Sequence, residues 1–167
     1  EFVKWLREGK PQIKKEIPGS SPRMTLGGKM KTVAGIDLGT QSMKVVIYDY
    51  EKKEIIEKAS CPMELISKAD GTREQKAEWF DNGLDVCFGK LSAANKKTIE
   101  AIGVSGQQHG FVPLGKNGKA LYNIKLWCDT STAKQCEKIT KAAGGDKNVV
   151  KLLGNLMLPG FTAPKIL

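Results

Sequence analysis

The pattern of apolar and polar positions predicts a protein that begins with three strands. Residues 32–37 and 44–50 are apolar and rich in β-branched side chains, and the short polar stretch Leu38–Ser42 separates them. Residues 54–63 form a third run of this kind after a charged break. Because the connections are short, we expect an antiparallel meander.

The pattern then changes to a helical period over Glu78–Lys97. Four apolar residues there recur at intervals of four, three and four, which places them on one helix face: Phe80, Leu84, Cys87 and Leu91. Residues 98–106 follow as a strand that we expect to be buried. Since it leaves a helix, we expect it to lie parallel to its predecessor in the sheet.

The last third of the chain predicts a turn and two helices. Asn117 and Gly118 lie between two apolar stretches, which indicates a tight hairpin. A hydroxyl residue among 130–132 can cap a helix that runs to about Ala143, and a second helix is expected to begin near Asp146. The predicted fold class is α/β, a mixed sheet that begins with the meander and is flanked by helices.

Residues 1–31 have the composition of a leader or linker. They contain three prolines and two glycine-containing breaks, and they show no sustained periodicity. Met30 stands just before the first strand and could be the native start. We therefore expect a leader over 1–31, either disordered or added upstream, and a folded domain over 32–167.

Composition fits one globular domain. Of the 167 residues, 40% are hydrophobic and 27% are charged. No apolar stretch approaches the roughly 20 residues that span a bilayer, and no signal-peptide core is present, so we expect no membrane partner. Four widely spaced cysteines and a single histidine favour reduced thiols in a cytoplasmic protein over a zinc site.

The net charge of +9 raises the hypothesis of nucleic-acid binding. Residues 1–31 hold eight Lys or Arg and three Glu, which leaves nineteen Lys or Arg and fifteen Asp or Glu for the rest. The body is therefore only mildly basic, with both signs interspersed. We expect no specific nucleic-acid binding, and a basic binding module stays the non-enzymatic alternative.

The polar stretch between the first two strands has the chemistry of a phosphate site. Consecutive backbone N–H groups in a glycine-containing turn form a concave site for anions. Asp37, at the end of the first strand, can hold Mg²⁺ through water. A plain hairpin with a polar turn is the structural alternative.

A second polar stretch follows the strand at 98–106. Gly106 leads into two amides and the only histidine, His109, before Gly110. Amides and imidazole can both donate and accept hydrogen bonds, so they suit the recognition of hydroxyl groups at the carboxyl end of a strand. An exposed polar turn is the alternative.

Five motifs together resemble a known family. "GIDLGTQSMKVVIYD" resembles the first phosphate motif of the sugar-kinase, actin and Hsp70 superfamily. "SGQQHG" resembles the sugar loop of the FGGY carbohydrate kinases, most closely their xylulokinase branch. "GTREQKAEWF", "LWCDTST" and "GNLMLPGFTAPKIL" are similar to further motifs of that branch. The resemblance covers residues 32–167 and implies a ribonuclease H-like, actin-like ATPase fold.

The resemblance implies ATP and Mg²⁺ as cofactors. Asp37 would organise the Mg²⁺, and the residues near the nucleotide phosphates would be Gly39, Thr40, Gln41 and Ser42, with charge added by Lys44. Gln108 and His109 would line a ketose site, and Trp127 and Asp129 would lie close to it. Core filling by Trp127 and helix capping by Asp129 stay open as structural alternatives. Packing is the favoured role of Met157, Pro159 and Phe161, which could instead form the wall of the sugar pocket.

The implied reaction is transfer of the ATP γ-phosphate to D-xylulose, giving D-xylulose 5-phosphate. Gluconate, ribulose, fuculose and glycerol kinases share the first motif and remain alternatives. No residue of this chain is assigned as the catalytic base, because the family's general-base aspartate is expected beyond Leu167. We therefore expect a truncated first lobe that is inactive alone, and its unpaired sheet edges would favour a homodimer.

Overall fold

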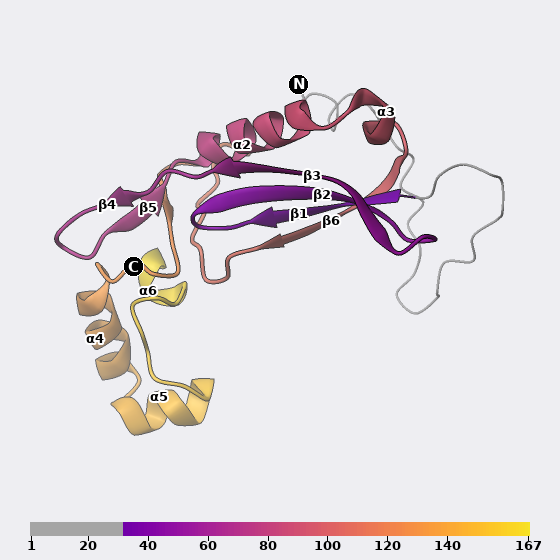
Figure 1. Ribbon diagram of the computed structural model, residues 1–167. Helices are drawn as coiled ribbons and strands as arrows, with labels where there is room; N and C mark the ends of the chain where they lie inside the picture. The colour runs from indigo at the N-terminus through magenta and orange to yellow at the C-terminus, as the bar shows by residue number, and fades with distance from the viewer. Residues whose placement is uncertain (1–31) are drawn as a thin grey trace.

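The computed structural model describes residues 32–167, so the predictions for residues 1–31 lie outside the described residues. The main sheet has the strand order β3-β2-β1-β6 (Figure 1). Its strands are β1 (Thr32–Leu38), β2 (Ser42–Asp49), β3 (Glu54–Pro62) and β6 (Ile99–Gly106). The first three strands are antiparallel neighbours and β6 is parallel to β1, which confirms both the meander and the parallel return.

Buried and less buried residues alternate along β1 and β2, and the buried ones form the sheet face that carries the core. Every second residue of these strands is buried, because successive side chains of a strand point to opposite faces. The buried apolar positions are Ala34 and Ile36 in β1 and Met43, Val45 and Ile47 in β2. They form one cluster with Cys87, Phe88 and Leu91.

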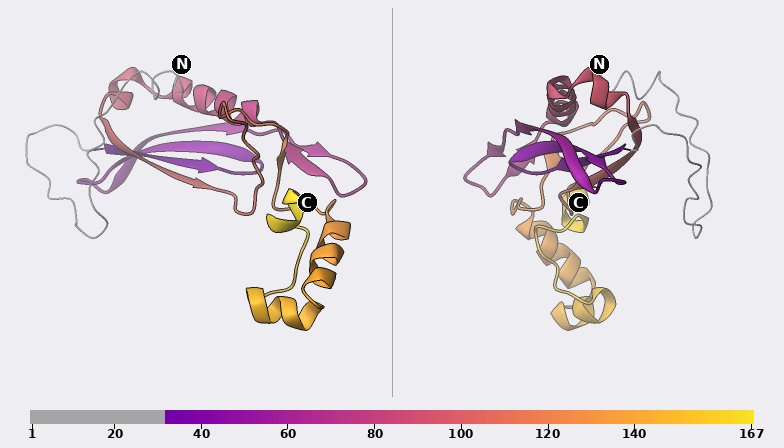
Figure 2. Two further views of the ribbon diagram at one scale, coloured as in Figure 1. Left: turned by 180° about the vertical axis from the view of Figure 1, so that it is seen from behind. Right: turned by 45° about the vertical axis from the view of Figure 1, so that its right-hand side comes forward.

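Helix α2 (Ala77–Lys90) lies along this face of the sheet (Figure 2). Its buried Gly83 allows close contact, because a Cβ atom there would lie 3.1 Å from Met43 Cε and 3.3 Å from Met63 Sδ. Cys87 and Leu91 are buried, and Phe80 and Leu84 pack against the same cluster. The predicted apolar helix face is therefore confirmed.

The expected extent of that helix is wrong. Helix α2 ends at Lys90, and the separate short helix α3 spans Ala93–Lys96. Ser92 has an extended backbone, and its Oγ accepts the N–H of Asn95 at 3.2 Å. Glu57 of β3 in turn accepts the N–H of Ser92 at 2.8 Å. An N-cap serine held by a neighbouring strand therefore ends the helical period.

The expectation that the strand at 98–106 is buried is also wrong. Within the described residues β6 forms an edge of the main sheet, and Val104 is 65% exposed. An apolar sequence alone does not tell a central strand from an edge strand, because both contain β-branched residues.

A second, small sheet connects the main sheet to the C-terminal helices. It has the order β4 (Ile66–Ser67), β5 (Arg73–Gln75) and β7 (Ile124–Lys125). The predicted turn at Gly118 is present, with φ at +73° and the Gly115 N–H bonded to the Lys119 carbonyl at 2.8 Å. The turn is flanked by two isolated bridges, Leu114 to Ala120 and Phe111 to Lys125, and not by long strands.

Three helices follow, and Figure 1 shows two of them projecting away from the main sheet. Helices α4 (Ala133–Ala142) and α5 (Asp146–Leu153) agree with the predicted positions, and α6 spans Ala163–Ile166. Positive φ angles of +83° at Gly144 and +99° at Gly145 let the chain turn between α4 and α5.

We expect substitution of Met43 by alanine to lower the free energy of unfolding by about 2–5 kcal/mol, because it leaves a cavity beneath α2. Val86→Ala, at a position of α2 that is 44% exposed, is the matched control and should change it little. Urea denaturation followed by circular dichroism measures both variants. Equal midpoints for the two variants would show that the sheet face under α2 is not the core.

Candidate active site

A short glycine loop, defined here as Gly39–Gln41, connects β1 to β2. The turn is shorter than expected, because Leu38 ends β1 and Ser42 already begins β2. A Cβ atom at position 39 would lie 2.6 Å from the Ser42 carbonyl oxygen, so only glycine fits this backbone. The loop is fixed to β3, because the Met63 N–H bonds the Gln41 carbonyl at 2.9 Å.

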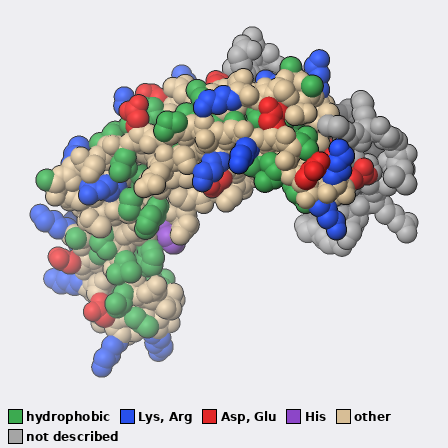
Figure 3. Space-filling model, viewed as in Figure 1, with side chains coloured by type: hydrophobic (Ala, Val, Ile, Leu, Met, Phe, Trp, Pro, Cys, Tyr) green, Lys and Arg blue, Asp and Glu red, His purple; other side chains and the backbone are tan. Residues whose placement is uncertain are grey.

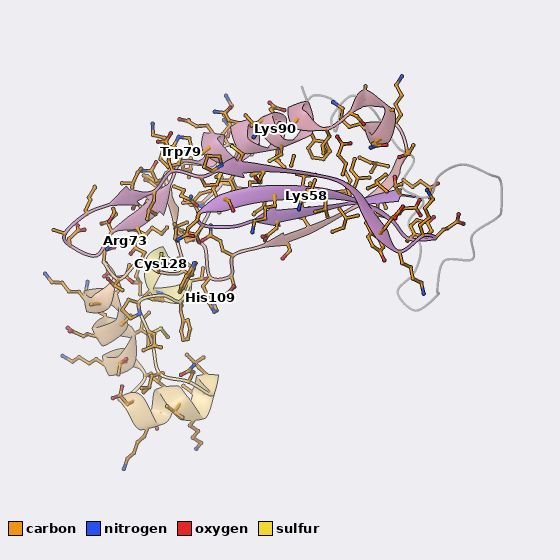
Figure 4. The ribbon with its side chains drawn as sticks, viewed as in Figure 1. Lys58, Arg73, Trp79, Lys90, His109 and Cys128 are labelled. Carbon is orange, nitrogen blue, oxygen red and sulfur yellow. The ribbon has the colours of Figure 1, made fainter. Side chains whose placement is uncertain are left out.

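The residues that sequence assigns to the nucleotide lie together around one open hollow of about 540 Å³. They are Asp37, Gly39, Thr40, Gln41, Ser42 and Lys44. Arg73, Trp127 and Cys128 also line the hollow. Figure 4 places Arg73 and Cys128 toward the end of the sheet where the C-terminal helices begin, far from Lys58.

The hollow combines one carboxylate, two cations and free backbone donors. Asp37 is exposed and lies opposite Lys44 in the β1–β2 ladder. The Arg73 side chain is oriented by a hydrogen bond from its Nη1 to the Thr72 carbonyl at 2.7 Å. Within residues 32–167, the N–H groups of Gly39–Gln41 make no hydrogen bond. These donors are therefore available to an anion.

A buried amide connects the glycine loop to the rest of the site. The Gln75 side chain is fully buried, and its Nε2 donates to the Thr40 carbonyl at 2.9 Å and to the Glu64 carbonyl at 2.7 Å. Its Oε1 accepts Nε2 of Gln107 at 3.2 Å. The buried amide is thus fully satisfied, as a low-dielectric environment requires.

The Thr40 hydroxyl completes this network. It donates to Oε1 of Gln107 at 2.8 Å and accepts the indole N–H of Trp127 at 3.1 Å. Trp127 is 48% exposed, so it does not fill the core, and its indole lies against the glycine loop. The network of Thr40, Gln75, Gln107 and Trp127 therefore joins four motifs that are far apart in the sequence.

Sequence reasoning did not assign Gln75, Gln107 or Arg73 to the site. The quoted motifs contained all three, but exposed-looking polar residues carried no sign of burial. For Gln75 the available signal was its place in the quoted motif "GTREQKAEWF". The structure shows that Gln75 and Gln107 orient the loops on which the assigned residues stand.

The histidine loop, defined here as Gln107–Gly110, leaves the carboxyl end of β6. The Gln107 N–H bonds the Leu38 carbonyl at 3.1 Å, which places the loop beside the end of β1. Gln108 and His109 are exposed, and the His109 ring lies 5.0 Å from the Phe161 ring. Figure 3 shows His109 at the surface, in the inner bend between the sheet and the projecting helices.

Met157 and Pro159, which like Phe161 could pack or form the wall of the sugar pocket, have other contacts in the structure. Met157 is buried in a cluster with Cys136 and Val149, so it packs against the C-terminal helices. The Pro159 carbonyl accepts the Thr132 hydroxyl at 3.1 Å, which fixes the chain near the start of α4. Of the three, Phe161 is the one that contacts a residue assigned to the sugar.

Asp129 is fully buried at the corner between β7 and α4. Its Oδ2 accepts the Arg73 N–H at 2.7 Å, and its Oδ1 accepts both the N–H and the hydroxyl of Ser131, at 3.0 and 2.6 Å. It therefore caps the turn before α4 and not the helix itself, whose N-cap is Thr132. Its protein contacts favour a structural role that fixes the backbone near Trp127.

These contacts set the charge state of Asp129. Burial alone would raise the pKa of this carboxyl, but the hydrogen bonds from Ser131 and Arg73 outweigh burial and hold the pKa below its usual range. Lys125, whose Nζ lies 3.4 Å from Oδ2, adds a favourable charge and also pairs with Glu74 at 3.0 Å.

Two classes of feature are absent from the described part of the chain. Over residues 32–167, no three or more His, Cys, Asp or Glu side chains gather as a metal centre. In the same range, none of the helices has the length and apolar character needed to cross a bilayer.

Comparison with known proteins identifies the class. Residues 32–167 match the N-terminal domain of the FGGY family of carbohydrate kinases. The xylulose kinase of Haemophilus influenzae is 37% identical over 139 residues, a match that covers 79% of this chain and 28% of that enzyme. The chain spans about 28% of the length of this enzyme and of two further curated xylulose kinases that it matches.

Solved structures agree with this assignment. A xyloylose kinase from Brucella ovis superposes with a TM-score of 0.71 at 29% identity, covering 81% of this chain and 28% of that one. The glycerol kinase of Plasmodium falciparum with ADP superposes with a TM-score of 0.73 at 25% identity, covering 85% and 29%.

The chain therefore belongs to the FGGY family of carbohydrate kinases. The expected actin-like α/β fold is confirmed, and the chain forms part of an N-terminal lobe.

We expect Asp129→Asn to destabilise the protein at pH 7, because an amide nitrogen would face one of the N–H donors now bonded to the carboxylate. Since the folded-state pKa lies below the model-compound value of 3.8, the carboxylate contributes stability above that value, and the contribution is lost as pH falls through the folded pKa. The difference in urea midpoint between the two proteins should therefore be constant above about pH 5 and shrink at lower pH. A difference that grows on acidification would contradict this assignment.

Proposed function

We propose that the whole protein transfers the γ-phosphate of MgATP to D-xylulose, giving D-xylulose 5-phosphate. The observation that carries the proposal is the network that joins the glycine loop to the histidine loop through Gln75, Gln107 and Thr40. Such a network holds an anion site, in the glycine loop, and a hydroxyl site, in the histidine loop, in fixed positions relative to each other. The sequence similarity to xylulose kinases supports the choice of sugar.

The residues of the hollow fit a nucleoside triphosphate with its metal ion. The N–H groups of Gly39–Gln41, which make no hydrogen bond within residues 32–167, supply donors for phosphate oxygens, and Lys44 and Arg73 supply positive charge. An exposed carboxylate suits a hydrated Mg²⁺, so Asp37 would hold the ion through water. When bound, Mg²⁺ neutralises part of the charge that develops during phosphoryl transfer.

The histidine loop would bind the ketose. Gln108 and the imidazole of His109 are exposed and can each donate to and accept from sugar hydroxyl groups. Trp127 would lie between the two substrates, because its indole bonds the glycine loop and its backbone belongs to the corner fixed by Asp129. Asp129 would thus contribute to the sugar side by placing Trp127.

The proposal assigns no catalytic base to this chain. A general-base aspartate outside its residues would take the proton of the sugar hydroxyl as the phosphoryl group arrives. Positioning and exclusion of water supply most of the rate in phosphoryl transfer, so we expect residues 1–167 alone to give no measurable turnover. We also place the enzyme in the cytoplasm, where ATP and reduced thiols occur together.

One test of the proposed substrate is a panel of sugars with the whole enzyme and a coupled ATP-consumption assay. We expect D-xylulose to have the highest kcat/KM among D-xylulose, gluconate, ribulose, fuculose and glycerol. His109→Ala should raise the KM for D-xylulose about tenfold, because one hydroxyl partner is lost, and leave the KM for ATP unchanged. Lys116→Gln, in an exposed turn, is the control. Preference for glycerol would replace the proposed substrate and keep the reaction class.

Gly39→Ala tests the nucleotide side. The added Cβ would lie 2.6 Å from the Ser42 carbonyl oxygen, so the glycine loop must move and we expect the KM for ATP to rise about tenfold or more. Gly89→Ala is the matched control, because position 89 has open space around it. Steady-state kinetics at saturating sugar compares the two. An unchanged KM for ATP in Gly39→Ala would remove the glycine loop from the nucleotide site.

A further inference from the structure

Lys165 of α6 is a buried lysine that binds main-chain carbonyls. It is 6% exposed, and its Nζ donates to the carbonyl of His109 and to the carbonyl of Gly160, both at 2.7 Å. Lysine is rarely buried without partners, because removing its charge from water is costly. The two acceptors belong to separate loops, so one ammonium group connects them.

The backbone of His109 depends on this contact. His109 has a φ angle of +58°, in the left-handed region that non-glycine residues seldom occupy. The histidine loop is held at its start by the bond from Gln107 to Leu38, and Phe111 after it bonds Lys125 at 2.9 Å. Within residues 32–167, no other hydrogen bond than that of Lys165 holds Gln108, His109 or Gly110.

The second acceptor places the ring that packs on the histidine. Gly160 directly precedes Phe161, whose ring lies 5.0 Å from the His109 ring at an angle of 48°. The same ammonium group therefore fixes the backbone beneath the imidazole and the backbone next to its aromatic neighbour. Figure 4 shows His109 beside the C-terminal segment from which Lys165 and Phe161 come.

The turn at Gly160, which Lys165 holds, also packs against Trp127. A Cβ atom at Gly160 would lie 2.5 Å from the Trp127 carbonyl oxygen, so this turn packs directly against the corner that carries the tryptophan. Trp127 in turn donates to Thr40 of the glycine loop. Lys165 is thus connected directly to the histidine loop and, through Gly160 and Trp127, to the glycine loop, although it does not line the hollow beside the glycine loop.

We infer that Lys165 is a positioning residue, whose ammonium group holds the His109 backbone and Phe161 so that the imidazole faces the sugar. The importance of this position for catalysis rests on the proposed function, whereas the effect on the imidazole does not. Burial lowers the pKa of Lys165, and the nearby Asp129 opposes that change. A side chain that donates two hydrogen bonds is required, and an apolar side chain of similar length cannot replace it.

Histidine-selective NMR tests the positioning directly, because His109 is the only histidine of the 167 residues. With ¹⁵N-labelled imidazole, the wild-type chain should give one sharp set of ring signals and a nuclear Overhauser effect to the Phe161 ring. Lys165→Met should reduce that effect at least about twofold and broaden the signals, because the loop samples more conformations. Lys165→Arg should restore both, and Lys134→Met on the exposed face of α4 is the control.

Circular dichroism establishes that each variant is folded. If Lys165→Met does not fold, Lys165→Gln takes its place, since glutamine is neutral and too short to reach both carbonyls, and the same loss is expected. Unchanged ring signals and an unchanged Phe161 effect in a folded Lys165→Met or Lys165→Gln variant would overturn the inference.

Kinetics of the whole enzyme separate the inference from the proposed function. Lys165→Met should raise the KM for D-xylulose about tenfold with little change in the KM for ATP, as a displaced sugar ligand predicts. A merely structural role would lower the active fraction and leave both KM values unchanged, which would contradict positioning. If the wild-type enzyme does not use D-xylulose, the proposed function fails, and the NMR result still decides the inference about His109.

Discussion

The buried side-chain amide of Gln75 is the constraint on which the candidate site depends. It has two N–H donors and one carbonyl, and the carbonyls of Thr40 and Glu64 and the side chain of Gln107 satisfy them. An unsatisfied amide in this environment would cost about 1–3 kcal/mol, so each partner must keep its place. One side chain therefore connects the glycine loop, the start of the histidine loop and the segment just before β4.

Two further anchors fix the remaining side of the site. Asp129 holds the corner after β7 by accepting hydrogen bonds from Arg73 and Ser131, and Trp127 extends from that corner to the glycine loop. The Asp129 carboxylate is buried, and its hydrogen-bond partners are protein atoms. The groups that we propose for the nucleotide are the glycine-loop N–H groups, which make no hydrogen bond within residues 32–167, together with Asp37, Lys44 and Arg73. The groups that we propose for the sugar are Gln108 and His109. Apart from Arg73, the residues that hold the loops in place are thus different from those proposed to contact substrates.

Much of the fold followed from local patterns. Period-two runs gave the meander, spacing of apolar residues gave the face of α2, and paired glycines gave the end of α4. The break at Ser92 did not follow, because Glu57 from β3 stabilises it, and a contact between distant segments leaves no local pattern. The exposure of β6 was missed for the same reason, since its neighbours in space decide it.

The chemistry of the site was easier to predict than its support. Glycines, an acid at a strand end and a histidine between an amide and a glycine are visible in the sequence, and the structure gathers the six residues assigned to the nucleotide around one hollow. Gln75 and Lys165 are long polar side chains that would ordinarily be exposed. Their burial depends on acceptors supplied by loops 35 and 56 residues away, which only the folded chain brings within reach.

The most direct test of the account is a crystal structure of the whole enzyme with a nonhydrolysable ATP analogue, Mg²⁺ and D-xylulose. The account predicts phosphate oxygens within hydrogen-bond distance of the Gly39–Gln41 amides, a sugar hydroxyl on the His109 imidazole, and the Gln75 hydrogen bonds unchanged. Nucleotide bound away from the glycine loop, or a sugar that leaves His109 without contact, would contradict it.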